Sequence, residues 1–216
     1  MNGRKMKMEF MKLIRQKSMT LHQAAENSGF LKRLLNGNAD VSSYSEYLYN
    51  LCAVYEAIEQ SLESCQEVEA LKPFITPELY RTSKIKQDLD YLVPNHSLTL
   101  LASTEAYISR IHEVAANTPE LIIPHAYTRF LADLFGGRTL ATLMVETYKI
   151  SNEGLNYYEF DELEDIRAYV MTYHHKLGAL ALDETLKQTF LNEVSNAYIY
   201  NLAISEELEV KRYSNQ

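Results

Sequence analysis

The chain has 216 residues, of which 46% are hydrophobic, and its formal net charge is −8 at neutral pH. That length suits one large domain with a sizeable buried core, and the acidic balance argues against a nucleic-acid-binding protein. No run reaches the roughly 18 to 20 apolar residues of a membrane-spanning helix, and the basic N-terminus lacks the apolar stretch of a signal peptide. We therefore expect a soluble, cytoplasmic protein with a single domain over residues 1–216.

Apolar residues recur at helical spacing through most of the chain. The clearest segment spans residues 44–62, and others cover approximately 97–117, 162–178 and 183–209. Only seven glycines and five prolines are available to interrupt helices, which favours long ones. No segment shows a convincing alternation of apolar and polar residues, which is the pattern of a β-strand. The pattern predicts an all-α fold of about seven to nine helices.

Two expected helix starts share one form. Thr76-Pro77-Glu78 and Thr118-Pro119-Glu120 each offer an N-cap hydroxyl, a proline suited to the first turn and an acid near the positive end of the helix dipole. Glycine, asparagine and proline predict loops at 36–38, 94–95 and 151–154.

The stretch HAYTRFLADLFGGRTL, residues 125–140, predicts a helix with a glycine pair inside it. On a helix, Arg129, Asp133 and Gly136 share one face, which is small at its centre and polar at one end. Each glycine costs about 1 kcal/mol relative to alanine, yet the apolar period continues beyond the pair, so a kink is expected. Such a helix can approach a large flat group. Close helix packing with an ordinary Arg129–Asp133 pair is the alternative that these residues alone favour.

His22 and Glu26 lie one helical turn apart within LHQAAE, residues 21–26. A lone helical histidine is usually a surface residue. A carboxylate that accepts a hydrogen bond from the ring N–H, however, fixes the imidazole tautomer and raises its basicity as a metal ligand. A histidine on one helix that faces a small-residue kink on another is the arrangement that sandwiches a haem.

Over nearly its whole length the sequence resembles the haem oxygenases of mammals and several bacteria. LHQAAENSGF resembles the family's proximal-helix motif, with His22 at the iron-ligand position, and HAYTRFLADLFGGRTL resembles its distal-helix signature. Further matches in order and spacing are VYEA at 54–57, KQDL at 86–89, RIHEV at 110–114, PEL at 119–121 and GLNYYEF at 154–160. The resemblance implies a haem held between a proximal helix and a kinked distal helix.

The resemblance also implies the reaction and the roles of several residues. Haem is both prosthetic group and substrate, and with dioxygen and electrons it is converted to biliverdin, carbon monoxide and ferrous iron. His22 ligates the iron and Glu26 supports it. Asp133 orders water that delivers a proton, and Arg129 and Tyr55 complete its hydrogen-bond network. The charge of Arg129 is expected to keep Asp133 ionised.

On the distal side the chain departs from the family pattern. Ala132 stands where glycine is usual, and Phe135 stands where a small polar residue is usual. Ala132, Gly136 and Gly137 are expected to line the haem. An extra methyl group in a tight site costs about 1 to 3 kcal/mol, so we predict slower turnover than a glycine at 132 would give.

On the haem-propionate side, Arg15 and Tyr127 match family positions. Basic side chains are usual in the family at three positions that differ here, namely Met19, Val170 and His174. Candidates to replace the missing positive charges are Lys17, His174 and His175. We expect Arg15, Tyr127 and His174 to contact haem, and we expect Arg15 and Tyr127 to favour the α isomer of biliverdin.

No flavin or iron–sulfur motif is present, so the resemblance implies a separate electron-donor protein of reductase, ferredoxin or flavodoxin type, and a monomer. The alternative is a haem-binding protein without turnover. His22 would serve both, whereas Asp133 favours the enzyme. A more remote alternative is a thiamin-salvage enzyme on the same scaffold, which would need a cysteine nucleophile. Cys52 and Cys65 lie in no such motif and, about 20 Å apart on one helix, cannot pair.

Overall fold

The computed structural model describes residues 2–94 and 98–214, and over these ranges it contains α- and 3₁₀-helices and no β-strand. The α-helices are α1 (Asn2–Glu26), α2 (Gly29–Leu35), α3 (Val41–Ser64), α4 (Thr82–Leu92), α5 (Ala102–Asn117), α6 (Ile122–Glu146), α7 (Ile166–Gly178) and α8 (Glu184–Ser214). Short 3₁₀-helices are η1 (Lys72–Phe74), η2 (Pro77–Leu79), η3 (Pro119–Leu121), η4 (Asn152–Gly154) and η5 (Asn156–Tyr158). The all-α prediction is confirmed.

The four long segments predicted from apolar periodicity correspond to α3, α5, α7 and α8. Their boundaries differ by up to five residues, as expected where a helix end depends on its cap. The predicted loop at 36–38 is present, and residues 151–154 form a tight 3₁₀ turn. Of the loop expected at 94–95, residue 95 lies outside the described ranges.

The two predicted threonine caps are wrong. Thr76 and Thr118 precede the short 3₁₀-helices η2 and η3, and neither hydroxyl caps the helix that follows. The Thr76 hydroxyl donates to the carbonyl of Phe74 instead, so it faces back along the chain. The prolines do occupy the first turn, as expected. Aspartates cap three α-helices, through Asp40 on α3, Asp165 on α7 and Asp183 on α8.

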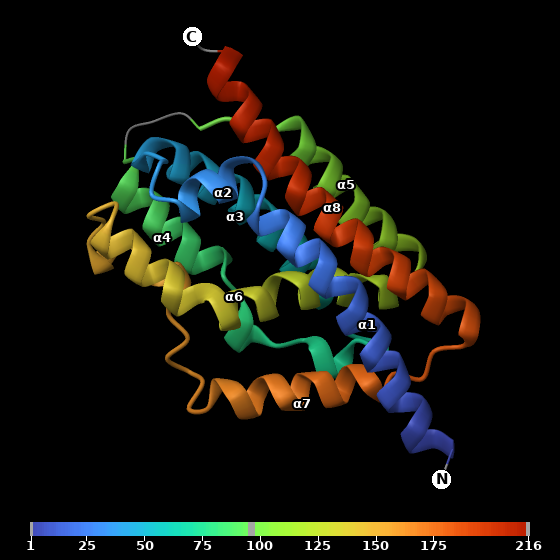
Figure 1. Ribbon diagram of the computed structural model, residues 1–216. Helices are drawn as coiled ribbons and strands as arrows, with labels where there is room; N and C mark the ends of the chain where they lie inside the picture. The colour runs from blue at the N-terminus through green and yellow to red at the C-terminus, as the bar shows by residue number, and fades with distance from the viewer. Residues whose placement is uncertain (1, 95–97, 215–216) are drawn as a thin grey trace.

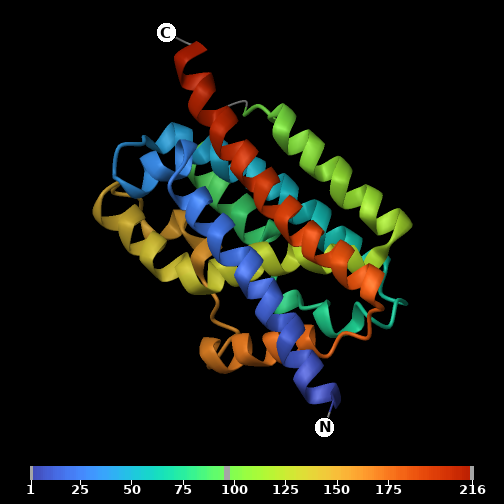
Figure 2. The same cartoon turned by 45° about the vertical axis from the view of Figure 1, so that its right-hand side comes forward.

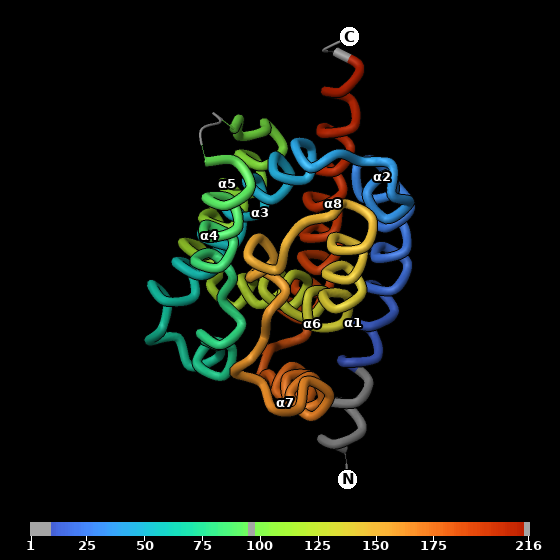
Figure 3. The backbone as a smooth tube through the Cα atoms, turned by 90° about the vertical axis from the view of Figure 1, so that its left-hand side faces the viewer, coloured from blue at the N-terminus to red at the C-terminus, as the bar shows by residue number. Residues whose placement is uncertain are grey.

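Helix α3 forms the centre of the core because apolar residues cover nearly all its faces. Tyr44, Leu48, Tyr55 and Ile58 are among its fully buried side chains. It packs between α4 and α5, while α8 runs alongside α1, α2 and α5 (Figure 1). Seen from the side, α6 lies between these two groups of helices and α7 crosses one end of the molecule (Figure 3). None of the described helices is both long and apolar enough to cross a membrane.

Helix α6 continues without interruption through Gly136 and Gly137, as the sequence predicted. It changes direction along its length, and this bend is seen most clearly in Figure 2. Its first half is almost completely buried, from Ile122 to Leu131. His125 and Arg129 on this half, and Asp133 just beyond it, are buried as well, so these polar side chains must find partners inside the protein.

Candidate active site

The proximal side of the candidate site is the pair of His22 and Glu26 near the end of α1. Nδ1 of His22 lies 3.4 Å from Oε1 of Glu26, and the histidine side chain is 43% exposed. The ring of Tyr198 on α8 lies edge-on to the imidazole, with 6.3 Å between centroids. The carboxylate therefore engages Nδ1 and leaves Nε2 as the nitrogen that can ligate a metal, as the sequence spacing predicted.

The distal side is built around the carboxylate of Asp133 on α6, which is only 8% exposed. The Tyr157 hydroxyl donates to Oδ1 at 2.7 Å, and the Tyr55 hydroxyl donates to Oδ2. These phenols come from η5 and α3, so two elements other than its own helix fix this carboxylate. Tyr55 and Asp133 were expected to meet, whereas Tyr157 was not identified from the sequence as a site residue.

The guanidinium of Arg129 completes this cluster, but its partners differ from those expected. It donates to Oδ1 of Asn201 and to the Tyr157 hydroxyl at 3.1 Å each, and it reaches Oδ1 of Asp133 only at 3.4 Å. Burial raises the pKa of Asp133, and the Tyr157 hydrogen bond offsets part of that rise. Arg129 was expected to favour the ionised form of Asp133, but desolvation is the dominant influence on this pKa, and the arginine is shared among several acceptors.

Beyond Arg129, polar contacts continue from the distal cluster towards the surface. Asn201 lies 3.5 Å from the Tyr107 hydroxyl, which in turn lies 3.3 Å from Nδ1 of His125. Nε2 of His125 is 3.1 Å from Oε1 of Glu193. Arg110 donates twice to Glu193, at 2.7 and 3.0 Å, and its side chain is partly exposed. Although burial alone would raise it, the pKa of Glu193 is lowered to about 2 by hydrogen bonds from His125 and Arg110.

The predicted propionate-side residues come together from three helices. Nη2 of Arg15 on α1 lies 3.1 Å from Nδ1 of His174 on α7. The Tyr127 ring on α6 is 6.2 Å from the His174 ring, and Ser18 donates to the Tyr127 hydroxyl at 3.4 Å. Arg15, Tyr127 and His174 thus form one cluster, which we call the edge cluster.

The remaining candidates on that side are arranged less favourably. Val170 is buried in the core, and Met19 is 63% exposed. Lys17 and His175 are both exposed. The edge cluster is therefore the one place among the described residues where the predicted anchors meet.

The residues beside the glycine pair are placed in two different ways. A Cβ added to Gly136 would have no atom within 4 Å, whereas one on Gly137 would lie 3.8 Å from the rings of Tyr158 and Phe160. Ala132 is half-buried and Phe135 is 66% exposed. Gly136 thus borders open space, while Gly137 packs against the η5 region.

Together these residues suit a haem. An imidazole with a free nitrogen lies on α1 and an open glycine lies on α6, and both helices contribute to the edge cluster, whose Arg15 suits the anionic propionates.

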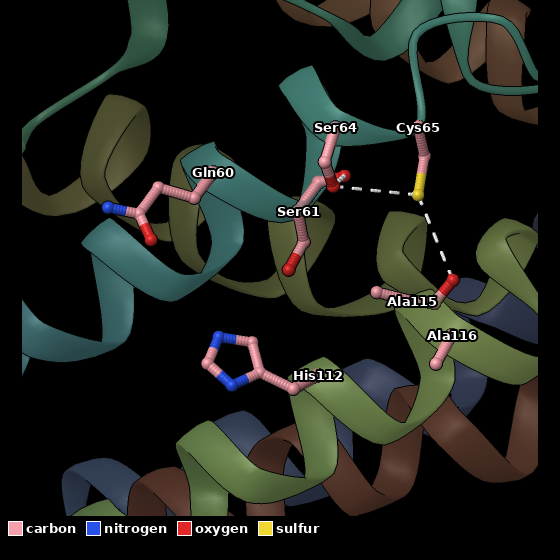
Figure 4. A pocket seen from close by; sticks show the side chains of 7 residues that line it. All are labelled: Gln60, Ser61, Ser64, Cys65, His112, Ala115 and Ala116. Atoms are coloured by element: carbon pink, nitrogen blue, oxygen red, sulfur yellow. Dashed lines mark hydrogen bonds between the residues drawn. The ribbon is translucent and has the colours of Figure 1, made fainter.

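A separate cavity of about 390 Å³ lies between α3 and α5 (Figure 4). It is lined by Gln60, Ser61, Ser64, Cys65, His112, Ala115 and Ala116. The Cys65 thiol contacts the carbonyl of Ala115 at 3.7 Å, and the His112 ring points away from it. A thiol without a base beside it is a poor nucleophile, so the cavity does not favour a cysteine-dependent enzyme.

Comparison with known proteins gives a single family. Residues 8–207 match the model of the family described as Heme oxygenase. Heme oxygenase 1 from the cyanobacterium Synechocystis is 31% identical over 199 residues, which cover 91% of this chain and 83% of that protein. Heme oxygenase 1 from Nostoc is 34% identical over 192 residues, which cover 87% and 81%.

Solved structures agree with the sequence relatives. The crystal structure of Synechocystis heme oxygenase-1 in complex with heme superposes with a TM-score of 0.89 at 30% identity, over 95% of both chains. The heme oxygenase of Leptospira interrogans superposes with a TM-score of 0.87 at 28% identity, over 92% of this chain and 98% of that one.

The fold and the site define a class of all-α enzymes that hold haem between two helices and use one histidine as the candidate iron ligand. The chain belongs to the haem oxygenase family.

Proposed function

We propose that the protein cleaves haem oxidatively to biliverdin, carbon monoxide and ferrous iron, with dioxygen and with electrons from a separate protein. When bound, haem supplies the iron that binds dioxygen and the porphyrin ring that is cut. The observation that carries the proposal is the buried Asp133 carboxylate held by two phenols. A protein that only stores haem has no need of a proton-handling group at this position.

His22 ligates the iron through Nε2 in this proposal. Glu26 accepts the Nδ1 proton, which keeps the ring in one tautomer and makes Nε2 a better donor. A neutral imidazole donates less electron density than a thiolate would. This weaker donation suits a haem whose own porphyrin ring is to be oxidised.

Asp133 binds and orients water beside the haem. Each carboxylate oxygen has two lone pairs, and the phenols of Tyr55 and Tyr157 occupy one on each oxygen. Arg129 also contacts Oδ1, so the remaining lone pair of Oδ2 is the one that can accept from a water molecule, which would deliver a proton by general acid catalysis. Arg129 holds the phenol of Tyr157 and contacts Asp133.

The edge cluster binds the propionates and sets the rotation of the ring. Arg15 supplies a permanent charge, Tyr127 a hydroxyl, and His174 an imidazole that becomes a cation when a propionate approaches. Ala132, Gly136 and Gly137 form the distal wall, with Gly136 facing the most open space.

We propose that a separate protein of reductase, ferredoxin or flavodoxin type donates the electrons. We also propose that the protein is a monomer with one domain over residues 1–216 and that it works in the cytoplasm. Because the chain is acidic, we propose no nucleic-acid partner for it.

The experiment that tests the proposal is aerobic turnover of bound haem with ascorbate as reductant. We expect the haem absorption bands to be replaced by those of biliverdin, with one iron released per haem. In His22→Ala we expect the fold to persist, the normal haem spectrum to be lost and turnover to stop. Wild-type protein that binds haem tightly but returns it unchanged would indicate a haem carrier instead.

A further inference from the structure

Tyr157 makes short polar contacts with both charged groups of the distal cluster, and nothing in the sequence motifs assigns it a role. Its hydroxyl donates to Oδ1 of Asp133 at 2.7 Å and accepts from Nη2 of Arg129 at 3.1 Å. The direct contact between Arg129 and Asp133 is longer, at 3.4 Å. The phenol therefore bridges the two charged groups.

A buried carboxylate on α4 fixes the position of Tyr157. Asp88, which is fully buried, accepts from the backbone N–H groups of Asn156 and Tyr157 and from the Asn156 side chain, each at 2.8 Å. The Tyr157 ring packs against Tyr158 and Tyr55, with centroids 4.8 and 6.0 Å away. The backbone and the ring of Tyr157 are both constrained, so its hydroxyl has little freedom to leave the cluster.

Asp133 also depends on Tyr157 for its orientation. Its other phenol partner is Tyr55 on α3, whose hydroxyl donates to the opposite carboxylate oxygen, Oδ2. With one donor on each oxygen, the plane of the carboxylate is fixed. Without the Tyr157 hydroxyl, only the longer contact from Arg129 would hold Oδ1, so the group could rotate more freely about its Cβ–Cγ bond and change which lone pairs face water.

We propose that Tyr157 is a positioning residue of the distal site, whose hydroxyl clamps the Asp133 carboxylate against Tyr55 and couples it to Arg129. The inference rests on the proposed function, since the clamp matters for catalysis only if Asp133 orders water beside haem. Asp88 supports the clamp from the other side of the η5 turn.

The titration of Asp133 reports directly on this contact. The titratable groups facing Asp133 are Tyr47 and Tyr55 from α3, Tyr157 and Tyr158 from η5, and Arg129 on α6 itself. Burial raises the pKa of Asp133, and the hydrogen bond from Tyr157 lowers it. Removing that hydroxyl therefore raises the pKa further.

The experiment compares Tyr157→Phe with Tyr158→Phe as a matched control. Each variant removes one buried hydroxyl from the same turn, but the Tyr158 hydroxyl bonds to Tyr44 and not to Asp133. The Asp133 carboxyl is titrated by carbon-13 NMR in the haem-free protein. Biliverdin formation is then measured in the haem-loaded protein over a range of pH.

In Tyr157→Phe we expect a raised Asp133 pKa, biliverdin formation slowed by about tenfold and a pH profile shifted to higher pH. Tyr158→Phe should match the wild type in all three. Asp88→Asn weakens the support of the turn, so it should change the Asp133 pKa, the rate and the pH profile in the same direction but by less. It serves as the test if Tyr157→Phe unfolds.

An unchanged Asp133 pKa or an unchanged rate in Tyr157→Phe overturns the proposal, as do equal changes in Tyr158→Phe. Failure of the wild type to form biliverdin contradicts the proposed function instead, and the NMR titration still shows whether the clamp exists.

Discussion

Arg15 and His174 meet where α1 passes α7, with Nη2 of the guanidinium 3.1 Å from Nδ1 of the imidazole. The arginine carries only donors, so Nδ1 must be an unprotonated acceptor for the two to bond. Burial, and after it the positive charge of Arg15, lower the pKa of His174. In the haem-free protein the edge cluster therefore carries one positive charge rather than two.

This contact predicts a pH dependence of stability. Because the folded-state pKa of His174 lies below its unfolded value of about 6.5, the folded state binds fewer protons than the unfolded chain. The stabilisation is complete above that value and is lost as the pH falls below it towards the lowered folded pKa. We expect the melting temperature of the wild type to fall more steeply with acidification than that of His174→Gln. Parallel curves for the two proteins would show that the ring does not titrate in this way.

The edge cluster also predicts which meso carbon is cut. Arg15 and Tyr127 both lie beside His174, and we expect them to hold haem so that the α isomer of biliverdin predominates. Arg15→Ala removes the permanent charge and should increase the share of other isomers, as measured by chromatography of the product. A wild-type product that is mainly β or δ would mean that the absence of basic side chains at Met19, Val170 and His174 has allowed the ring to rotate.

Ala132 provides a test of the distal wall. It is half-buried and lies one helical turn before Gly136, beside which the space is open. A methyl group that crowds bound dioxygen or its water costs about 1 to 3 kcal/mol, so Ala132→Gly should turn over haem faster despite a helix-propensity cost of about 1 kcal/mol. Single-turnover kinetics give the rate, and thermal melting gives the cost. A variant no faster than wild type would show that the methyl is harmless.

Glu193 predicts acid sensitivity at the other end of the polar chain. The pKa of its carboxyl is about 2, below the ordinary value of 4.5. Its ion pair with Arg110 and its contact with His125 therefore stabilise the fold above pH 4.5 and lose that effect as the pH falls towards 2. Glu193→Gln should lose roughly 3 kcal/mol of unfolding free energy at neutral pH and show a flatter acid branch. Urea melts at several pH values measure both effects, and an unshifted midpoint would contradict the assignment.

The main features of the fold could be predicted from local patterns. Apolar periodicity located α3, α5, α7 and α8 because their inward faces repeat every three to four residues. The threonine caps failed because a Thr-Pro-Glu triplet is equally compatible with a 3₁₀ turn. That choice depends on how neighbouring chain segments pack rather than on the triplet itself.

Within the site, spacing and resemblance located His22, Asp133, Arg129 and Tyr55. Tyr157 was missed because an aromatic run resembles ordinary core, and the direction of its hydroxyl depends on Asp88, which is 69 residues away in sequence. Long-range contacts of this kind leave no periodic signal. The raised pKa of Asp133 was missed for a related reason, since adjacency to arginine is visible in the sequence and the depth of burial is not.

The most direct test of the central claim is to identify what becomes of one equivalent of haem in wild type and in Asp133→Ala. Asp133 does not bind the iron, so both proteins should take up haem with equal affinity. We expect the wild type to yield biliverdin, carbon monoxide and iron in equal amounts. The variant should yield little biliverdin and should oxidise added phenols in peroxidase fashion, because proton delivery is no longer controlled. Equal biliverdin yields from the two proteins would contradict the account, since proton delivery would then not depend on the Asp133 carboxylate.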